Sequence, residues 1–416
     1  MDAHRAIERS ARDSYGRLLS YLASRTRDLA AAEDALADAF QSALETWPGA
    51  GVPENPDAWL LTAARRRLID ASRRDRIRSE AAPTLIAMAQ ASESSIADGF
   101  IFPDERLKLM FLCAHPAIDP AARTPLMLQT VLGLDAGRIA SAFLVRPSAM
   151  SRRLTRAKVK IRDARISFDS PEAEELPSRL EAVLEAIYAA YGSGWDDLSG
   201  SDPKRRGLSV EAIDLGELVV SSLPVEPEAL GLLALMLHCE ARRPARRDAK
   251  GAYIPLSDQD TTLWSTESIV RADWLLRTAE RAGRIGRFQL EAAIQSVHAR
   301  RVATGRTDWE TIALLYEGLI RIAPTIGALV GRAAAVAEAR DALTAWALLG
   351  AIPVAAVAEY QPYWALAARL LALLNRFSEA RAAYGKAIGL CEDRATRDFL
   401  VHQMQIQDDY LMKDVL

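Results

Sequence analysis

Residues 135–164 read DAGRIASAFLVRPSAMSRRLTRAKVKIRDA, and they predict two helices joined by a tight connection. A short helix over about 135–143 ends at Leu144-Val145-Arg146, and Pro147 suits the first turn of the next helix. The second helix repeats apolar residues at spacings of four and three, so they share one inward face. These residues are Met150, Leu154, Ala157 and Ile161. The polar side chains near the start of this helix are therefore expected to face outward.

This layout is typical of a helix-turn-helix, whose second helix presents its first residues to the major groove of DNA. Serine and arginine side chains there can contact base edges, and lysines and arginines further along are expected to meet phosphates. The expected base-facing residues are Ser148, Ser151, Arg152, Thr155 and Arg156, and the expected phosphate contacts are Lys158, Lys160 and Arg162. Leu144 stands where many such turns carry glycine, so the sequence leaves the turn geometry open.

A second amphipathic helix is predicted over residues 33–47. Its apolar face carries Leu36, Phe40, Ala43 and Trp47. A polar stripe repeats the same spacing on another face and consists of Asp34, Asp38, Gln41 and Glu45. Such a stripe is usually only solvated, but an acidic stripe can also dock a basic partner.

Residues 55–78 predict a third helix, which is strongly basic. Asn55 suits its N-cap, Pro56 its first turn, and Asp57 the positive end of the helix dipole. An apolar stripe on this helix consists of Leu61, Ala64, Leu68 and Ala71. The arginines lie on the other faces, and they are Arg65, Arg66, Arg67, Arg73, Arg74, Arg76 and Arg78. Trp59 is either a core or boundary aromatic or a platform for a base, since aromatic rings among cations suit melted strands.

The composition is that of an ordinary globular protein. The 416 residues are 50% hydrophobic and 26% charged with a net charge of -3, which excludes wholesale disorder and a coiled-coil fibre. Residues 1–170 carry a net +4 and residues 171–416 a net -7, and the two basic helices of the first part favour contact with a polyanion. We expect a cytoplasmic protein without a membrane span, because the start lacks an apolar signal core and no apolar run is long enough.

The whole chain reads as all-α, because alanine, leucine, arginine and glutamate dominate and no long strand pattern occurs. One exception is a possible short hairpin around Gly251, within residues 248–256. Linker-like composition divides the chain into residues 1–80, a linker 81–103, residues 104–168, a linker 169–177 and a large helical domain 178–416. Within the last part, residues 363–390 are similar to one TPR helix pair, with Ala380, Tyr384 and Ala387 on its second helix.

Taken together, residues 10–168 resemble the extracytoplasmic-function sigma factors of bacterial RNA polymerase. The resemblance rests on residues 32–48, 55–74 and 103–134 and on the helix-turn-helix, in the order sigma region 2, linker, sigma region 4. One subgroup of that family carries a helical, TPR-like domain after region 4. Residues 226–246, 256–264, 288–299 and 308–325 look like that subgroup, whereas residues 189–207 match it poorly.

The resemblance implies roles for particular residues. The stripe of Asp34, Asp38, Gln41 and Glu45 would bind the clamp coiled coil of core RNA polymerase, and region 4 would meet its flap. The promoter -10 element would be engaged by Trp59, Arg65, Arg66, Arg67, Arg73 and Arg74. The -35 element would be read by Ser148, Ser151, Arg152, Arg153, Thr155, Arg156 and Lys158. Such factors have no catalytic residues, cofactor or metal, because the polymerase performs the chemistry.

The C-terminal domain implies a further partner protein or an intramolecular contact with the basic helices. No phosphate-binding loop, zinc-protease or serine-hydrolase motif occurs, which argues against an enzyme. Two other interpretations stay open. One is a DNA-binding regulator without sigma activity, and the other is a sigma-like protein that only occupies the polymerase.

Overall fold

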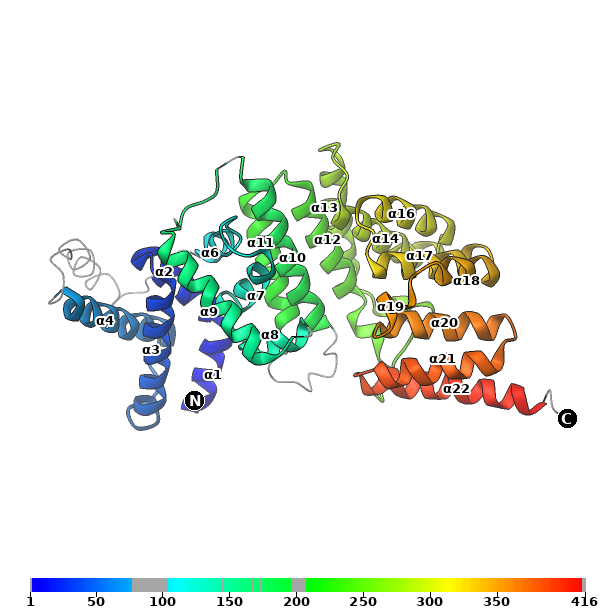
Figure 1. Ribbon diagram of the computed structural model, residues 1–416, viewed down its shortest axis with the longest axis horizontal. Helices are drawn as coiled ribbons and strands as arrows, with labels where there is room; N and C mark the ends of the chain where they lie inside the picture. Colours follow the sequence, from blue (N-terminus) through cyan, green and yellow to red (C-terminus); the bar gives the residue numbers. More distant parts are fainter. Residues whose placement is uncertain are drawn as a thin grey trace. The chain divides into compact units, whose positions relative to one another are not determined.

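The computed structural model describes residues 2–76, 104–143, 145–166, 168–172, 174–195 and 207–413. Throughout these ranges the regular elements are helices, as the sequence predicts (Figure 1). An isolated antiparallel bridge joins Arg247 to Tyr253 around Gly251, whose φ is +83°. The short hairpin expected there is therefore reduced to a single bridge. The expected linker 81–103 lies outside the described residues.

The chain divides into two units. Unit 1 contains Met1–Trp195 and Lys204–Leu215, and unit 2 contains Asp196–Pro203 and Gly216–Leu416. The helices of unit 1 are α1 (Ala3–Asp13), α2 (Tyr15–Thr26), α3 (Leu29–Ala50), α4 (Pro56–Arg76), α6 (Arg106–Cys113), α7 (Pro120–Thr130), α8 (Ala136–Ala142), α9 (Pro147–Asp163) and α10 (Leu176–Trp195). The division falls inside α11 (Leu208–Ser222).

The first helices of unit 1 pack α3 between α2 and α4. Asp28 caps α3 by accepting a hydrogen bond from the Ala31 backbone N–H at 3.0 Å, and Asn55 caps α4 through the Ala58 N–H at 3.0 Å. The predicted apolar faces are largely confirmed. Buried on α3 are Leu36, Ala43 and Trp47, and buried on α4 are Leu61 and Ala64, whereas Phe40 and Leu68 are only half-buried. The side chain of Ala71 lies outside the described residues.

The later helices of unit 1 include the predicted helix pair. Helix α9 starts with Pro147 in its first turn, and the four residues predicted to face inward are all buried: Met150, Leu154, Ala157 and Ile161. Helix α10 packs against α7 and α6, and its buried side chains include Val183 and Ile187. It begins at Leu176, inside the expected linker 169–177. Unit 1 therefore continues beyond residue 178, where the sequence places the start of the C-terminal domain.

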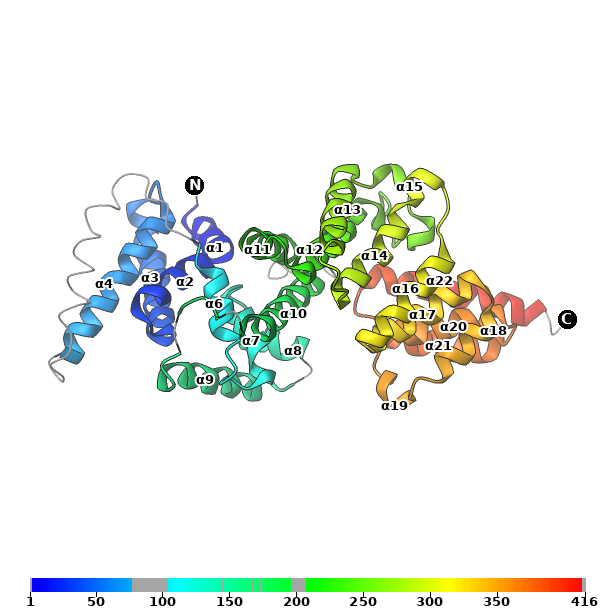
Figure 2. The same cartoon turned by 90° about the horizontal axis from the view of Figure 1, so that it is seen from above.

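Unit 2 is a succession of helices (Figure 2), most of which pack on their chain neighbours, whereas α14 packs mainly on α12. They are α12 (Pro227–Ala241), α13 (Thr266–Glu280), α14 (Arg287–Ala299), α15 (Arg301–Thr304), α16 (Trp309–Ile322), α17 (Ile326–Ala339), α18 (Ala342–Gly350), α19 (Val354–Val357), α20 (Gln361–Leu373), α21 (Phe377–Leu390) and α22 (Arg394–Lys413). Helices α20 and α21 form the pair expected in residues 363–390. Ala380, Tyr384 and Ala387 are buried there, and Asn375 turns the chain with a φ of 58°.

Candidate polymerase and nucleic-acid interface

The acidic stripe lies on the solvent side of α3. Asp34, Asp38, Gln41 and Glu45 are all exposed. The Gln41 Nε2 donates to the Glu45 Oε1 at 3.1 Å, and Asp38 has the guanidinium of Arg67 at 3.9 Å. Both contacts are at the surface, where such pairs contribute little to stability. The stripe is therefore available to a basic partner.

Trp59 belongs partly to the fold. It is half-buried near the start of α4, and its ring meets that of the buried Trp47 edge to face, with centroids 5.4 Å apart and planes at 73°. This edge-to-face geometry is favourable for aromatic rings. The structure thus gives Trp59 the boundary position that the sequence left as one of two interpretations.

The arginines of α4 differ in their surroundings. The Arg65 Nη2 donates to the Tyr21 Oη at 2.5 Å, and its guanidinium lies 5.1 Å from the centre of that ring, so Arg65 fastens α4 to α2. Arg66 and Arg67 are exposed. The side chains of Arg73 and Arg74 lie outside the described residues. Of the arginines whose side chains are described, Arg66 and Arg67 are the ones presented to solvent.

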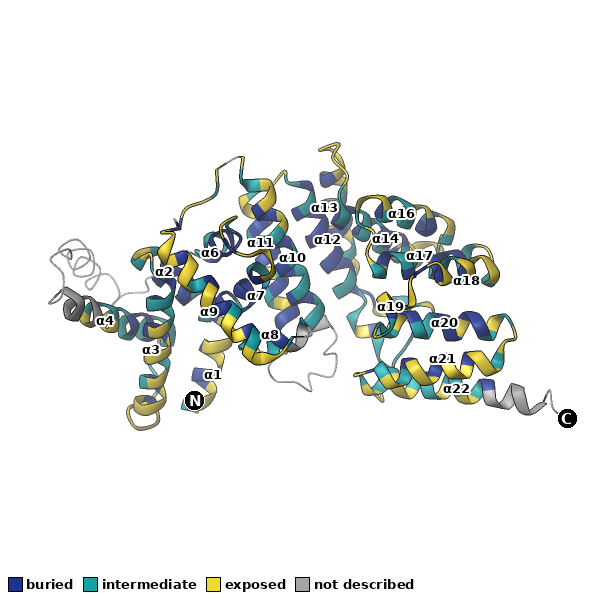
Figure 3. Ribbon diagram, in the orientation of Figure 1, coloured by how far each residue is buried: buried dark blue, intermediate teal, exposed yellow. Residues whose placement is uncertain are grey.

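Helix α9 has an exposed face at its N-terminal half (Figure 3). The side chains exposed there are Ser148, Ser151, Arg152, Thr155 and Arg156. Arg153 is half-buried, and its Nη1 donates to the Ala121 carbonyl at the start of α7 at 3.3 Å. The exposed arginines and serines can reach a partner, whereas Arg153 helps to hold α9 on α7.

Lys158, which the sequence predicts to face DNA, forms an ion pair of low exposure within unit 1. Its Nζ lies 2.5 Å from the Glu33 Oε2 on α3, and the two side chains are only 16% and 21% exposed. An ion pair of low exposure is screened less by salt than a surface pair. Glu33 is 125 residues away from Lys158, and nothing in the local sequence pattern predicts this partner.

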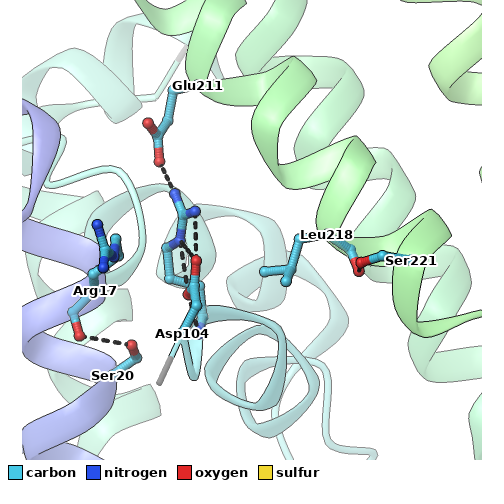
Figure 4. Close-up of polar contacts among 7 residues, drawn as sticks. Arg17, Ser20, Asp104, Glu211, Leu218 and Ser221 are labelled. Carbon is cyan, nitrogen blue, oxygen red and sulfur yellow. Dashed lines mark hydrogen bonds and ion pairs between the residues drawn. The ribbon is translucent and has the colours of Figure 1, made fainter. Parts of the chain in front are cut away.

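A second buried charge cluster surrounds Arg106 at the start of α6. The Arg106 Nη2 and Nε donate to the Asp104 carboxylate at 2.7 and 3.0 Å, and its Nη1 donates to Glu211 on α11 (Figure 4). Burial alone would raise the pKa of Asp104, but hydrogen bonding and charge from Arg106 outweigh it and lower that pKa. Burial, with the nearby Asp214 charge, raises the pKa of Glu211 despite Arg106. Nothing in the local sequence pattern around these residues predicts the cluster.

Across the described residues, no group of histidine, cysteine, aspartate and glutamate side chains could hold a metal ion. In those ranges no helix is long and apolar enough to cross a membrane. The candidate interface consists of the exposed faces of α3, α4 and α9 described above.

Comparison with known proteins identifies two segments. The sigma-70 region 2 family matches residues 11–77, which contain the end of α1 and the whole of α2, α3 and α4. A family of unknown function (DUF6596) matches residues 179–280, from α10 to the end of α13. No solved structure matches the chain.

A curated relative covers nearly the whole chain. It is an uncharacterized protein of Rhizobium meliloti (strain 1021), 37% identical over 393 residues, which are 94% of this chain and 92% of the relative. Because the alignment covers 94% of this chain, it extends across both matched segments and most of the helices that follow them. The chain therefore belongs to the family of this Rhizobium protein and carries a sigma-70 region 2 at its N-terminal end.

Proposed function

We propose that this protein is a sigma factor, which binds core RNA polymerase and directs promoter-specific initiation of transcription. The observation that carries the proposal is the match of residues 11–77 to sigma-70 region 2, over the helices with the acidic stripe and the exposed arginines. The promoter -10 element is then the ligand of α4, and the clamp coiled coil of the polymerase is the ligand of α3. The protein itself performs no chemistry.

Helices α8 and α9 act in this proposal as the helix-turn-helix of sigma region 4, which reads the -35 element and meets the polymerase flap. Support comes from the short connection between the two helices and from the exposed side chains of Ser151, Arg152 and Arg156. These are residue types that contact base edges in the major groove. Arg153 and Lys158 act in the fold instead, since each holds α9 to another helix.

Unit 2 supplies a protein-binding or regulatory function. Stacked helix pairs create extended surfaces suited to peptides and proteins, and α20 with α21 has the short turn and small buried residues expected of a TPR-like pair. We propose that this unit binds a partner protein or regulates the sigma activity of the same chain.

The test is run-off transcription with purified bacterial core polymerase, a genomic promoter library and the full-length protein as the only initiation factor. Discrete transcripts are expected. Arg152→Ala should abolish or redirect them with polymerase binding intact, and Asp38→Arg should weaken polymerase binding. Arg394→Ala is the matched control, because the Arg394 side chain is 92% exposed in unit 2.

The competing functions give different results in the same assay. Stable polymerase binding without transcripts from any promoter would favour a protein that only occupies the polymerase. Sequence-specific DNA binding without polymerase binding would favour a plain DNA-binding regulator. The -35 contacts should weaken steeply as salt rises, because binding to phosphates releases counterions.

A further inference from the structure

Helix α13 carries an exposed stripe on the face that points away from its neighbours in unit 2. The members of the stripe follow the spacing i, i+4, i+7 and i+11, which places them in one row along a helix. They are Val270, Trp274, Arg277 and Arg281, and all four are exposed. The opposite face of α13 carries the buried residues Ala272, Leu275 and Ala279. The packing of α13 therefore presents the whole stripe to solvent.

The N-terminal half of the stripe is apolar. Trp274 is 57% exposed, and Val270, one turn before it, is 59% exposed. Of the tryptophans whose side chains the structure describes, Trp274 is the exposed one. The others are buried or half-buried, namely Trp47, Trp59, Trp264, Trp309, Trp346 and Trp364. Adjacent large apolar side chains in water mark interaction sites, and tryptophan is enriched among the residues that carry the binding energy of protein interfaces.

The C-terminal half of the stripe is basic. Among the described residues, Arg277 and Arg281 form no ion pair. Glu280, which is next to Arg281 in the sequence, is turned about 100° away around the helix. Arginines in the last turn also stabilise a helix through its dipole, but this role does not explain why Trp274 is exposed beside them. A partner that covers the stripe therefore gains from acidic groups opposite the two arginines.

The backbone behind the stripe is held in place by polar contacts of α13. The Ser296 hydroxyl on α14 donates to the Asp273 Oδ1 at 2.8 Å, and the His238 Nε2 on α12 lies 3.4 Å from the same oxygen. On the other side of Trp274, the Arg271 Nη2 pairs with Glu217 of α11 at 2.6 Å. A surface that is fixed before binding loses little conformational entropy when a partner covers it.

The shape of the stripe selects the kind of partner. It extends over about eleven residues, or about 16 Å along the helix axis. The backbone groups of a helix interior are already hydrogen-bonded to each other, so α13 offers no edge to which an extended strand could be added. A second helix can pack along such a row, because side chains three and four residues apart interdigitate with those of a neighbouring helix. An amphipathic helix of about three turns matches the length.

We propose that α13 is a docking site for an amphipathic helix of a partner protein, which places apolar residues against Val270 and Trp274 and acidic residues against Arg277 and Arg281. The inference rests on the protein-binding function proposed for unit 2 and deepens it, since it names the surface and the chemistry of the partner. It does not depend on sigma activity. Val270, Trp274 and Arg277 lie within residues 179–280, so the docking site also gives a binding role to this segment of unknown function.

The experiment selects ligands for the full-length protein from a displayed library of helical peptides of about 18 residues, which is long enough for a helix to form. The library has an alanine- and glutamine-rich frame, and the positions i, i+4, i+7 and i+11 vary over all amino acids. Enriched peptides are expected to carry apolar residues at one end of this row and acidic residues at the other. Fluorescein-labelled copies are then titrated with the protein, and binding is measured by fluorescence anisotropy.

Variants of the stripe test where the enriched peptides bind. Trp274→Ala should weaken binding roughly tenfold or more. The double variant Arg277→Glu and Arg281→Glu should also weaken it, and peptides whose acidic residues are replaced by lysine should bind this double variant better than the wild type. Leu373→Ala is the matched apolar control, because Leu373 on α20 is 56% exposed. Arg394→Glu is the matched charge control, because the Arg394 side chain is 92% exposed. Both controls should bind the peptides like the wild type, and circular dichroism checks that every variant is folded.

Three results would overturn the docking site. The first is no enrichment on the wild type. The second is a set of enriched peptides that bind Trp274→Ala as tightly as the wild type, in which case unit 2 binds proteins through another surface. The third is a dimer of the wild type in sedimentation that becomes a monomer in Trp274→Ala, which would make a second copy of the chain the occupant. Absence of transcripts in the run-off assay would instead sink the sigma function and leave the peptide measurements as they are.

Discussion

Trp59 on α4 meets Trp47 on α3 edge to face, with ring centroids 5.4 Å apart. Trp47 is buried and Trp59 is half-buried, so this ring contact is part of the packing between the two helices. A residue proposed to face the -10 element therefore also stabilises the fold. Loss of transcription on removal of this ring cannot by itself be assigned to DNA binding.

We expect Trp59→Ala to lower the free energy of unfolding of unit 1 by about 2 kcal/mol, since a half-buried tryptophan loses less than a fully buried one. Trp59→Phe should keep most of that stability, because a smaller ring can still meet Trp47 at its edge. Chemical denaturation of the full-length protein measures both. A Trp59→Phe variant that is as stable as the wild type but fails to open promoters would assign the DNA role to the indole ring. Equal stability of Trp59→Ala and wild type would contradict the structural role.

Arg106 should be essential for the stability of unit 1, because it is the buried cation between Asp104 and Glu211. We expect Arg106→Met to destabilise the unit by about 3–5 kcal/mol, since it leaves two carboxylates without their counter-charge. We expect Glu211→Gln to lower the free energy of unfolding of unit 1 far less. It keeps an acceptor for Arg106 and removes a carboxylate whose pKa is raised by burial.

Thermal unfolding of the two Arg106-cluster variants at pH 7 and pH 4.5 provides the measurement. The lowered pKa of Asp104 contributes stability that is present above its ordinary value and is lost as the pH falls through the folded value. A raised Glu211 pKa has the opposite sign, so its protonation at acidic pH favours the folded form. The loss of stability for Glu211→Gln should therefore be smaller at pH 7 than at pH 4.5. Equal losses of stability for Arg106→Met and Glu211→Gln would contradict this prediction, because glutamine keeps the acceptor and the charge of Glu211 would then be essential.

Truncation should show that α10 belongs to unit 1. We expect a chain ending after residue 175 to lose cooperative unfolding, because α10 packs on α6 and α7 and buries residues such as Val183 and Ile187. Each fully buried aliphatic side chain contributes about 1.5–3 kcal/mol, against a total stability of about 5–15 kcal/mol for a domain. A chain ending after residue 222 keeps α10 and α11 and is the matched control. Hydrogen exchange of the α6 and α7 amides reports the difference, and equal protection in the two chains would contradict it.

Local patterns predicted the helices well and predicted their partners poorly. The apolar faces of α3 and α9 follow from spacing alone, because Leu36 and Leu154 each sit in a period that only a helix satisfies. The order of sigma segments came from the family resemblance, and the match of residues 11–77 to region 2 confirms its first part. The all-α class and the helix faces follow from composition and spacing. These are properties of neighbouring residues, and a single sequence displays them directly.

The interactions that define unit 1 depend on residues far apart in the chain. Glu33 and Lys158 are 125 positions apart, and Arg106 and Glu211 are 105 apart, so no periodicity connects them. The expected boundary at 178 follows a proline-rich, acidic composition, but α10 packs back onto α7 because its apolar face needs a partner. Arg65 likewise lies in a run of arginines that is typical of a DNA contact. Its hydrogen bond to Tyr21 depends on the packing of α4 on α2, which the local sequence does not show.

His298 should make the stability of unit 2 depend on pH. Burial, with the charges of Arg242 and Arg301, lowers the pKa of His298 to about 4, and its ring meets Trp309 edge to face at 5.2 Å. In the unfolded chain a histidine titrates near 6.5, so the unfolded state binds the proton more readily between these two values. Stability from this residue is then complete above about pH 6.5 and falls as the pH drops toward 4, by about 3 kcal/mol in all. We expect His298→Gln to flatten this part of the profile, whereas His402→Gln, at an exposed position on α22, should leave it unchanged. Thermal unfolding between pH 4 and 7.5 measures the slope, and parallel profiles for His298→Gln and the wild type would show that the buried imidazole does not control the acid sensitivity of this unit.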